Sequence, residues 1–205
     1  KSLIFITHKL KEVMALADRI TVLRGGKVVG SVRPKDATLE KLASMMVGRE
    51  VALVVKKKPP KVGETILEVK DLHVKDERQN LAVRGVSFDV HAGEVLGVAG
   101  VQGNGQTELV YALTGLAPIA SGEIRITGQT VKKATPRNIL ERGVAHVPED
   151  RQKHGLVLPF PIYDNMMLCT YYLPPFAKGV VLQEKIIREN ADRLVEQFDV
   201  RTPNA

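Results

Sequence analysis

The sequence predicts an α/β fold, and three neighbouring segments carry that prediction. The apolar run 95–99 is typical of a strand buried on both faces. A glycine-rich stretch, 100–107, follows at once, and leucines at 109, 113 and 116 then recur at helical spacing, with Gly115 as the helix stop. Strand, glycine loop and helix in this order predict a loop whose backbone N–H groups hold an anion at the start of a helix.

The residues before this region predict a smaller group of elements. Residues 3–6 have the pattern of a buried apolar strand, and residues 10–17 place apolar side chains at the spacing of a short helix. The segments 20–23 and 27–32 predict a hairpin that turns at two glycines. Residues 38–46 predict a closing helix.

In the second part of the chain, apolar and polar residues alternate more regularly. The segments 67–69 and 86–90 alternate apolar and polar residues, which predicts half-buried antiparallel strands. Residues 123–129 predict another such strand ending in a turn, and residues 144–147 a short strand that stops before a proline. The segment 182–198 carries one apolar stripe and predicts a long amphipathic helix.

Composition narrows the class of protein. The chain has 205 residues, enough for one domain or for one and a half, and its 44% apolar and 26% charged residues are ordinary for a globular protein. Its single cysteine, Cys169, excludes a disulfide framework and a cysteine-based zinc site, and suits a reducing compartment. No run approaches the ~18 apolar residues of a membrane span, and no signal peptide opens the chain.

The net charge of +7 invites a nucleic-acid interpretation. Four of the positive charges, however, fall within residues 56–61, a proline-bearing run without aromatic residues. Such a run is typical of a solvated linker. No helix-turn-helix, zinc finger or aromatic RNA-binding signature accompanies it, so we expect no nucleic-acid partner.

The glycine-rich stretch matches the phosphate-loop pattern G-x-x-x-x-G-K-[S/T] with one departure. Gly100, Gly105 and Thr107 fit the pattern, and Gln106 stands where the pattern has Lys. A unit charge about 4 Å from another contributes on the order of 4 kcal/mol at an effective dielectric of 20, before desolvation. The loop is therefore expected to bind nucleotide and to hydrolyse it poorly. The alternative is a glycine turn with a purely structural role.

His8 is the second candidate for chemistry. It follows the predicted strand 3–6 and precedes a helix, so it would lie at the carboxyl end of a strand, where open α/β sheets bind their ligands. A lone histidine in that place also serves as a cap or a packing residue, and the residues by themselves leave both roles open.

Several motifs together resemble the ATP-binding subunits of ABC transporters. Residues 4–13 resemble the switch-histidine region of that family, and the likeness continues through residues 17–27. Residues 97–116, 121–124 and 147–151 are similar to the opening half of another such domain. The resemblance implies part of a P-loop ABC-type ATPase fold, with a mixed central sheet, an antiparallel β-subdomain and the start of a helical subdomain. It is strongest to fused double-ATPase subunits of bacterial importers for simple sugars and nucleosides, and the loop itself suggests the nucleoside branch.

The order of the motifs implies two tandem copies. In one ABC ATPase domain the switch histidine follows the phosphate loop, but His8 precedes Gly100 by 92 residues. We therefore expect the end of a first ATPase domain at 1–50, a linker at 51–64 and the beginning of a second domain at 65–205. The Walker B strands and signature loops would lie outside this piece, so that it holds no complete ATP site.

The resemblance assigns roles position by position. His8 would contact the γ-phosphate and orient the attacking water at a site built on the first copy's loop. The second copy would bind ATP at the residues of its phosphate loop, which are Gly100, Gly103, Asn104, Gly105, Gln106, Thr107 and Glu108. The Thr107 hydroxyl would ligate Mg²⁺. Glu149 takes the place of the family's Q-loop glutamine, where a carboxylate can still bind a hard cation.

Two further assignments follow from the resemblance. Arg78 lies near the place of the adenine-stacking aromatic residue, which is absent between residues 71 and 86, and a guanidinium can stack on a base. Residues 155–172 resemble the entry to the helical subdomain that faces the permease. Their Met166-Met167 and Tyr171-Tyr172 pairs are either core or docking surface.

The resemblance also implies partners: two transmembrane permease subunits, a periplasmic or lipoprotein substrate-binding protein, and the second ATPase half of the same chain. The resemblance implies that the protein is a peripheral subunit on the cytoplasmic face of the inner membrane. Two alternatives remain: a non-transport ABC ATPase acting on nucleic acid or ribosomes, and a second half that is a regulatory nucleotide-binding module without turnover. Whether the substrate is a nucleoside or a simple sugar is not legible in an ATPase subunit.

Overall fold

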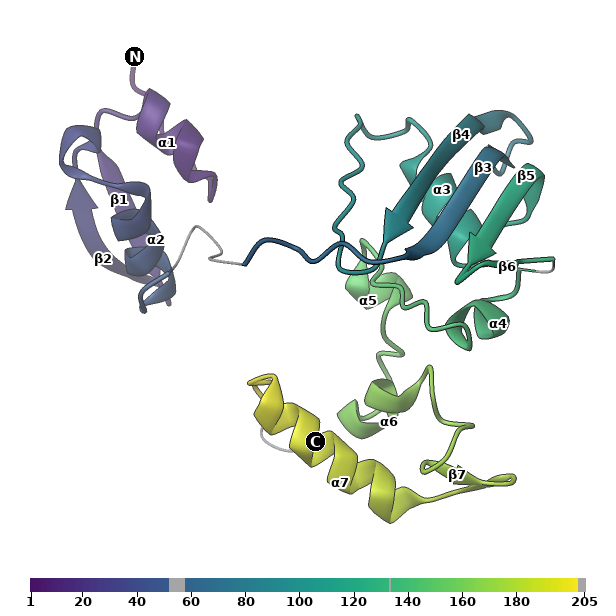
Figure 1. Ribbon diagram of the computed structural model, residues 1–205. Coiled ribbons are helices and arrows are strands. Elements are labelled where there is room, and N and C mark those ends of the chain that lie inside the picture. The colour runs from purple at the N-terminus through teal and green to yellow at the C-terminus, as the bar shows by residue number, and fades with distance from the viewer. Residues whose placement is uncertain (52–57, 133, 203–205) are drawn as a thin grey trace. The chain divides into compact units, whose positions relative to one another are not determined.

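The computed structural model describes residues 1–51, 58–132 and 134–202 and forms two compact units, Lys1–Pro59 and Pro60–Ala205 (Figure 1). The boundary between the units falls within the stretch predicted as a linker, 51–64. Residues 52–57, which include two of its lysines, lie outside the described residues. The assignment of the units to two ATPase domains stays a prediction.

The first unit pairs a β-hairpin with helices. Its elements are α1 (Leu10–Leu16), β1 (Ile20–Arg24), β2 (Lys27–Val32), the 3-10 helix η1 (Pro34–Asp36) and α2 (Leu39–Val47). Thr38 begins α2 as its N-cap, because its hydroxyl accepts a hydrogen bond from the N–H of Lys41 at 3.2 Å. Ile20, Val22 and Leu42 form a small core against which the apolar face of α1 packs. The predicted helices and hairpin are confirmed.

The predicted strand 3–6 is wrong for this structure. These residues form no strand, and Leu3, Ile4 and Ile6 are 89%, 89% and 93% exposed. The physical reason is that a buried strand needs hydrogen-bonding neighbours and cover on both faces. No other segment among the described residues pairs with it.

The second unit is built on an antiparallel sheet. Its first elements are β3 (Thr65–Lys75), β4 (Leu81–His91), α3 (Gln106–Leu113), β5 (Ile119–Ile126), β6 (Gln129–Thr130) and α4 (Pro136–Leu140). The strand order is β4-β3-β5-β6, and every neighbouring pair is antiparallel. α3 packs on one face of this sheet, where Leu109 and Ala112 join buried residues of β3, β4 and β5. This sheet and helix confirm the predicted α/β fold with its antiparallel β-subdomain.

The predicted mixed central sheet needs correction, because two segments expected to belong to it are not strands here. In residues 95–99, Val95 and Val98 are 81% and 61% exposed, and in residues 144–147, Val147 is 82% exposed. Their apolar sequences suit central strands, but the described residues offer no strand to pair with either segment. The segment that leads to the glycine loop consequently has no regular secondary structure.

The last part of the second unit is mostly helical. It contains α5 (Arg151–His154), α6 (Ile162–Met167), the short hairpin β7 (Ala177–Lys178) and β8 (Val181–Leu182), and α7 (Glu184–Gln197). The predicted long helix is confirmed, although Leu182 belongs to β8. Ile187 and Ala191 are buried on the apolar stripe of α7, which packs against α6.

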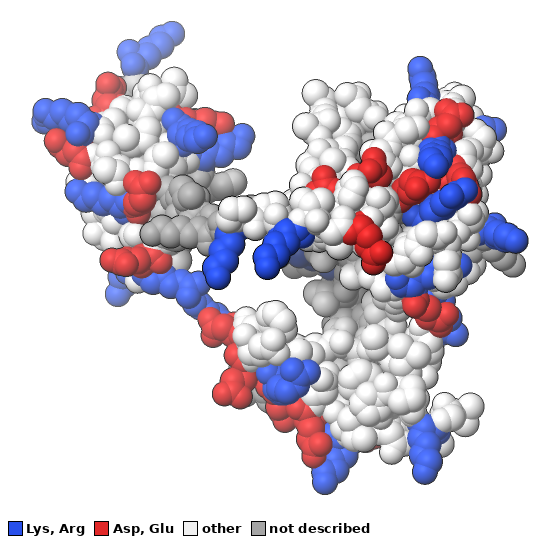
Figure 2. All heavy atoms as spheres, in the orientation of Figure 1, with Lys and Arg blue, Asp and Glu red and all other residues white. Residues whose placement is uncertain are grey.

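The methionine and tyrosine pairs of residues 155–172, which the sequence left open between core and docking surface, differ in exposure. Met167 is buried, whereas Tyr171 is 42% exposed and is contacted by Arg137 on α4. In the view of Figure 2, basic and acidic side chains are interspersed over the second unit and do not gather in one basic patch. No helix within the described ranges is long and apolar enough to cross a membrane.

Candidate functional site

The glycine loop is shaped by two glycines in the left-handed region. Gly103 has φ +89° and Gly105, the residue before α3, has φ +95°. A Cβ atom on Gly105 would lie 2.6 Å from the Ala82 carbonyl oxygen of β4, so only glycine fits there. A Cβ on Gly103 would meet no atom within 4 Å. The loop therefore lies close against the sheet at Gly105 and is open at Gly103.

Several N–H groups of the loop are available to a ligand. The Asn104 N–H is used internally, because it donates to the Val101 carbonyl at 3.2 Å. The N–H groups of Gly103, Gly105, Gln106 and Thr107 have no partner among the described residues. Unpaired N–H groups at the start of a helix bind anions, because the helix dipole adds to their partial positive charges.

The Gln106 side chain folds back over this loop. Its amide nitrogen donates to the Val101 carbonyl oxygen at 3.2 Å, and it would collide with a Cβ on Gly100. The side chain thus steadies the start of the loop from within. It brings a dipole to the place where a lysine would bring a full positive charge.

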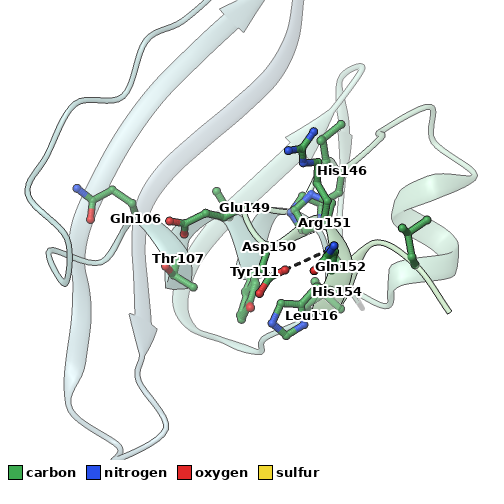
Figure 3. Close-up of a pocket in the computed structure, with 14 residues that line it drawn as sticks. Gln106, Thr107, Tyr111, Leu116, His146, Glu149, Asp150, Arg151, Gln152 and His154 are labelled. Atoms are coloured by element: carbon green, nitrogen blue, oxygen red, sulfur yellow. Dashed lines mark hydrogen bonds between the residues drawn. The ribbon is translucent and has the colours of Figure 1, made fainter. Parts of the chain in front are cut away.

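Thr107 and Gln106 also line a pocket of about 1220 Å³ in the second unit. One wall comes from α3 and its end, through Thr107, Tyr111 and Leu116, and the other from the segment 146–156. Figure 3 shows Glu149 reaching toward the side of Gln106 and Thr107, while Arg151 and His154 lie farther along the second wall. The volume is ample for the phosphates of a nucleotide.

Thr107 and Glu149 suit a magnesium ion that takes most of its ligands from the nucleotide phosphates and water. Both residues are exposed in the pocket, and the Glu149 carboxylate makes no hydrogen bond or ion pair with any described residue. No group of three or more His, Cys, Asp or Glu side chains within the described ranges could hold a metal ion by itself. Mg²⁺ commonly takes one or two protein oxygens and completes its shell with phosphates and water. One hydroxyl and one free carboxylate suit that pattern.

Asp150 organises the wall that presents Glu149. Its carboxylate caps α5 by accepting the N–H of Lys153 at 3.0 Å and that of Gln152 at 3.1 Å. The Lys153 N–H in particular stabilises the charged form, so the pKa of Asp150 lies below its usual range. Because the Asp150 carboxylate is engaged in this way, Glu149 is the carboxylate that stays free for a ligand.

Other predicted residues lie elsewhere. His8 is exposed and belongs to the first unit. Arg78 is exposed in the turn between β3 and β4, and Glu108 lies in the first turn of α3 without lining the pocket. Within the second unit, the structure thus brings Gln106, Thr107 and Glu149 to one pocket. The other predicted residues of this unit do not line it: Gly100, Gly103, Asn104, Gly105, Glu108 and Arg78.

Six lining residues with polar side chains were not among the predicted site residues: Tyr111, His146, Asp150, Arg151, Gln152 and His154. Tyr111 follows Thr107 by one helical turn, so the α3 periodicity could have found it. Arg151 and His154 follow an aspartate that has the signature of a helix N-cap. His146 falls within the segment 144–147, whose pattern predicts a strand and gives no sign of a pocket.

The sequence profile of the ABC transporter family matches residues 83–200, more than half of the chain. The chain is 48% identical over 201 residues to the nucleoside import ATP-binding protein NupA of Lactococcus lactis, covering 98% of the chain and 40% of that protein. It is 46% identical over 204 residues to the guanosine import ATP-binding protein NupO of Bacillus subtilis, covering 100% and 40%. To the ribose import ATP-binding protein RbsA of Clostridium tetani it is 36% identical over 203 residues, covering 99% and 39%. The chain therefore spans about two fifths of the length of these relatives.

Proposed function

Because the chain belongs to the ABC transporter family, we propose that it is part of the ATP-binding subunit of an importer for nucleosides or simple sugars. The observation that carries this proposal is the 48% identity over 201 residues with a relative named for nucleoside import. A second relative, 46% identical, is named for guanosine import, whereas the ribose relative stands at 36%. The ordering of these identities favours a nucleoside.

The tandem arrangement is the second part of the proposal. Residues 1–50 would be the end of one ATPase domain, 51–64 the linker and 65–205 the beginning of the next. Two compact units support it, as does the family match that begins in the second unit. The exposed apolar segments 3–6 and 95–99 would find their strand partners in the part of the relatives' length that this chain does not span.

The two ATP sites of the whole protein would then be unequal. In the second site, the free N–H groups of the loop would bind phosphate oxygens, and Thr107 and Glu149 would hold Mg²⁺. Mg²⁺, when bound, would supply positive charge that neutralises the charge of the phosphates. Gln106 adds no charge to the transferred phosphate, so this site would bind ATP and turn it over slowly or not at all. His8 would orient the attacking water at the first copy's site, and that site would do most of the hydrolysis.

The partners and place belong to the same proposal. An importer subunit of this kind would act with two transmembrane permease subunits and a substrate-binding protein on the cytoplasmic face of the membrane. The second ATPase half would be part of the same polypeptide. Helices α6 and α7 would lie on the side of the permease.

Uptake by cells tests the proposal. The full-length gene and its neighbouring permease genes are expressed in a strain unable to import nucleosides or ribose, and uptake of radiolabelled guanosine, adenosine and ribose is measured. We expect nucleoside uptake that is lost when the ATP-binding subunit carries His8→Ala. A folded, expressed protein that supports uptake of none of these substrates, and instead co-purifies with RNA or ribosomes, would favour the non-transport alternative.

A further inference from the structure

A single amide, that of Asn165, ties the pocket wall to the helical end of the second unit. Asn165 lies in α6, and its side chain makes four hydrogen bonds to backbone groups. The Oδ1 atom accepts the Val157 N–H at 2.8 Å, and Nδ2 donates to the carbonyl oxygens of Val157 at 3.1 Å, Phe160 at 3.1 Å and Pro161 at 3.2 Å. Both backbone groups of Val157 are thus held by the same side chain.

Val157 is directly joined to the pocket. The preceding residue, Leu156, lines it, as do Glu149, Asp150 and most of α5. α5 ends at His154, and its C-cap is Gly155, where a Cβ would lie 2.8 Å from the Arg151 carbonyl oxygen. The pocket wall therefore ends at Leu156, and the next residue, Val157, is the one that the Asn165 amide holds.

On its other side, α6 is fixed to α7. The Arg188 guanidinium carbon of α7 lies 4.2 Å from the centre of the Tyr163 ring of α6, and its Nη2 donates to the Tyr163 hydroxyl at 3.2 Å. Met167 and Ile187 are buried on the two helices. A displacement of α6 is consequently expected to carry α7 with it.

We propose that Asn165 is a positioning residue that transmits movement of residues 148–156, the part of the pocket wall that includes α5, to α6 and α7. An amide supplies an oxygen acceptor and two N–H donors from one planar group, and here the two donors are shared among three carbonyl oxygens. An aspartate would not serve in its place, because a carboxylate keeps the acceptor but sets negative charge against three carbonyl oxygens. The inference deepens the proposed function, because it gives nucleotide binding in the pocket a route to the surface expected to meet a permease.

The test uses Cys169, the exposed residue two positions after α6 and the single cysteine of this sequence. In full-length protein in which Cys169 is the only cysteine, it is labelled with an environment-sensitive fluorophore. Asp150→Ala perturbs the wall by removing the cap of α5. We expect this change to shift the fluorophore's emission, and the shift to fall about fivefold or more when Asn165→Asp is also present.

A matched control makes the same chemical change on α7. The Asn190 side chain accepts one hydrogen bond from Arg193 at 2.8 Å and does not touch the 157–161 segment through any described contact. Asn190→Asp should leave the response to Asp150→Ala intact. An unchanged response in the Asn165→Asp background, or an equal loss with Asn190→Asp, would overturn the inference.

Two further measurements separate this inference from folding and from the proposed function. Hydrogen exchange in the Asp150→Ala protein, with Asn165 intact, should change in α6 and α7 as well as in the wall; a change confined to residues 148–156 would refute the inference even if Asn165→Asp does not fold. Titration with Mg-ATP should move the emission of the wild type, while Asn165→Asp should bind Mg-ATP with similar affinity and show little emission change. Absence of Mg-ATP binding would contradict the proposed function, and the Asp150→Ala results would still decide the role of Asn165.

Discussion

Replacing Gly105 by alanine should destabilise the second unit more than the same change at Gly103. Both glycines have positive φ, +95° and +89°, so alanine is strained at either position. They differ in their surroundings. The new Cβ at position 105 would lie 2.6 Å from the Ala82 carbonyl oxygen and 3.2 Å from its carbon, whereas at position 103 it would meet nothing within 4 Å.

The expected magnitudes follow from these distances. A left-handed conformation costs an L-residue roughly 1–2 kcal/mol, which applies to both variants. Overpacking against a backbone group adds about 1–3 kcal/mol at Gly105 alone, since β4 is held in the sheet and cannot easily move. The lower entropy of the unfolded chain offsets about 0.4–1 kcal/mol in both variants and cancels from their difference. We therefore expect Gly105→Ala to lower the free energy of unfolding by about 1–3 kcal/mol more than Gly103→Ala.

Tyrosine fluorescence during urea unfolding provides the assay. The chain has four tyrosines and no tryptophan, and all four tyrosines lie in the second unit, so the signal reports on that unit alone. Tyr111 on α3 is close to the loop. Equal destabilisation by the two variants would refute the close approach of Gly105 to β4. A greater loss of stability in Gly103→Ala than in Gly105→Ala would likewise contradict the reasoning, because the close backbone contact is at Gly105.

Four other outcomes are expected. Gln106→Lys should tighten Mg-ATP binding in calorimetry by on the order of tenfold after solvent screening, and an unchanged affinity would mean that phosphate does not lie at this loop. In the full-length protein, His8→Ala should reduce hydrolysis by about 10²–10⁴-fold and Gln106→Ala much less; equal losses would contradict the unequal sites. The lowered pKa of Asp150 means that its stabilising effect is present above the unfolded-state pKa and is lost as the pH falls through the folded-state pKa. Asp150→Asn should accordingly be less stable than wild type at neutral pH and equally stable in strong acid, whereas a gap that persists in acid would argue against the cap. The 205-residue chain alone should release no phosphate from ATP, and turnover sensitive to Thr107→Val would show otherwise.

Elements held together by local interactions were predicted well from the sequence. The helix that begins at Thr38 is an example, because its cap is made by a residue three positions away and its apolar face by residues one turn apart. The hairpin at residues 20–32 is another, since its two glycines have the positive φ that its turn requires. The loop before α3 was found for the same reason: its glycines and the following helix are neighbours in sequence.

Segments whose structure depends on distant partners were predicted less well. Residues 3–6, 95–99 and 144–147 have the apolar composition of central strands, yet none is a strand here. Composition states which environment a segment prefers, but hydrogen bonds to neighbouring strands create the strand itself. The apolar pattern alone cannot report whether those neighbours are within the same chain.

The sequence by itself determined the family and located the glycine loop before α3, with its prediction of phosphate binding and a glutamine where the pattern has lysine, because each depends on residue types at short, fixed spacing. Only the tertiary structure decided that Glu149 faces the loop with a free carboxylate while Asp150 is engaged as a cap. It alone also joined Val157 to Asn165, eight residues apart. These outcomes depend on the direction in which the folded backbone points each side chain. Two adjacent acidic residues therefore cannot be told apart in the sequence, although in the structure one caps a helix and the other faces the pocket.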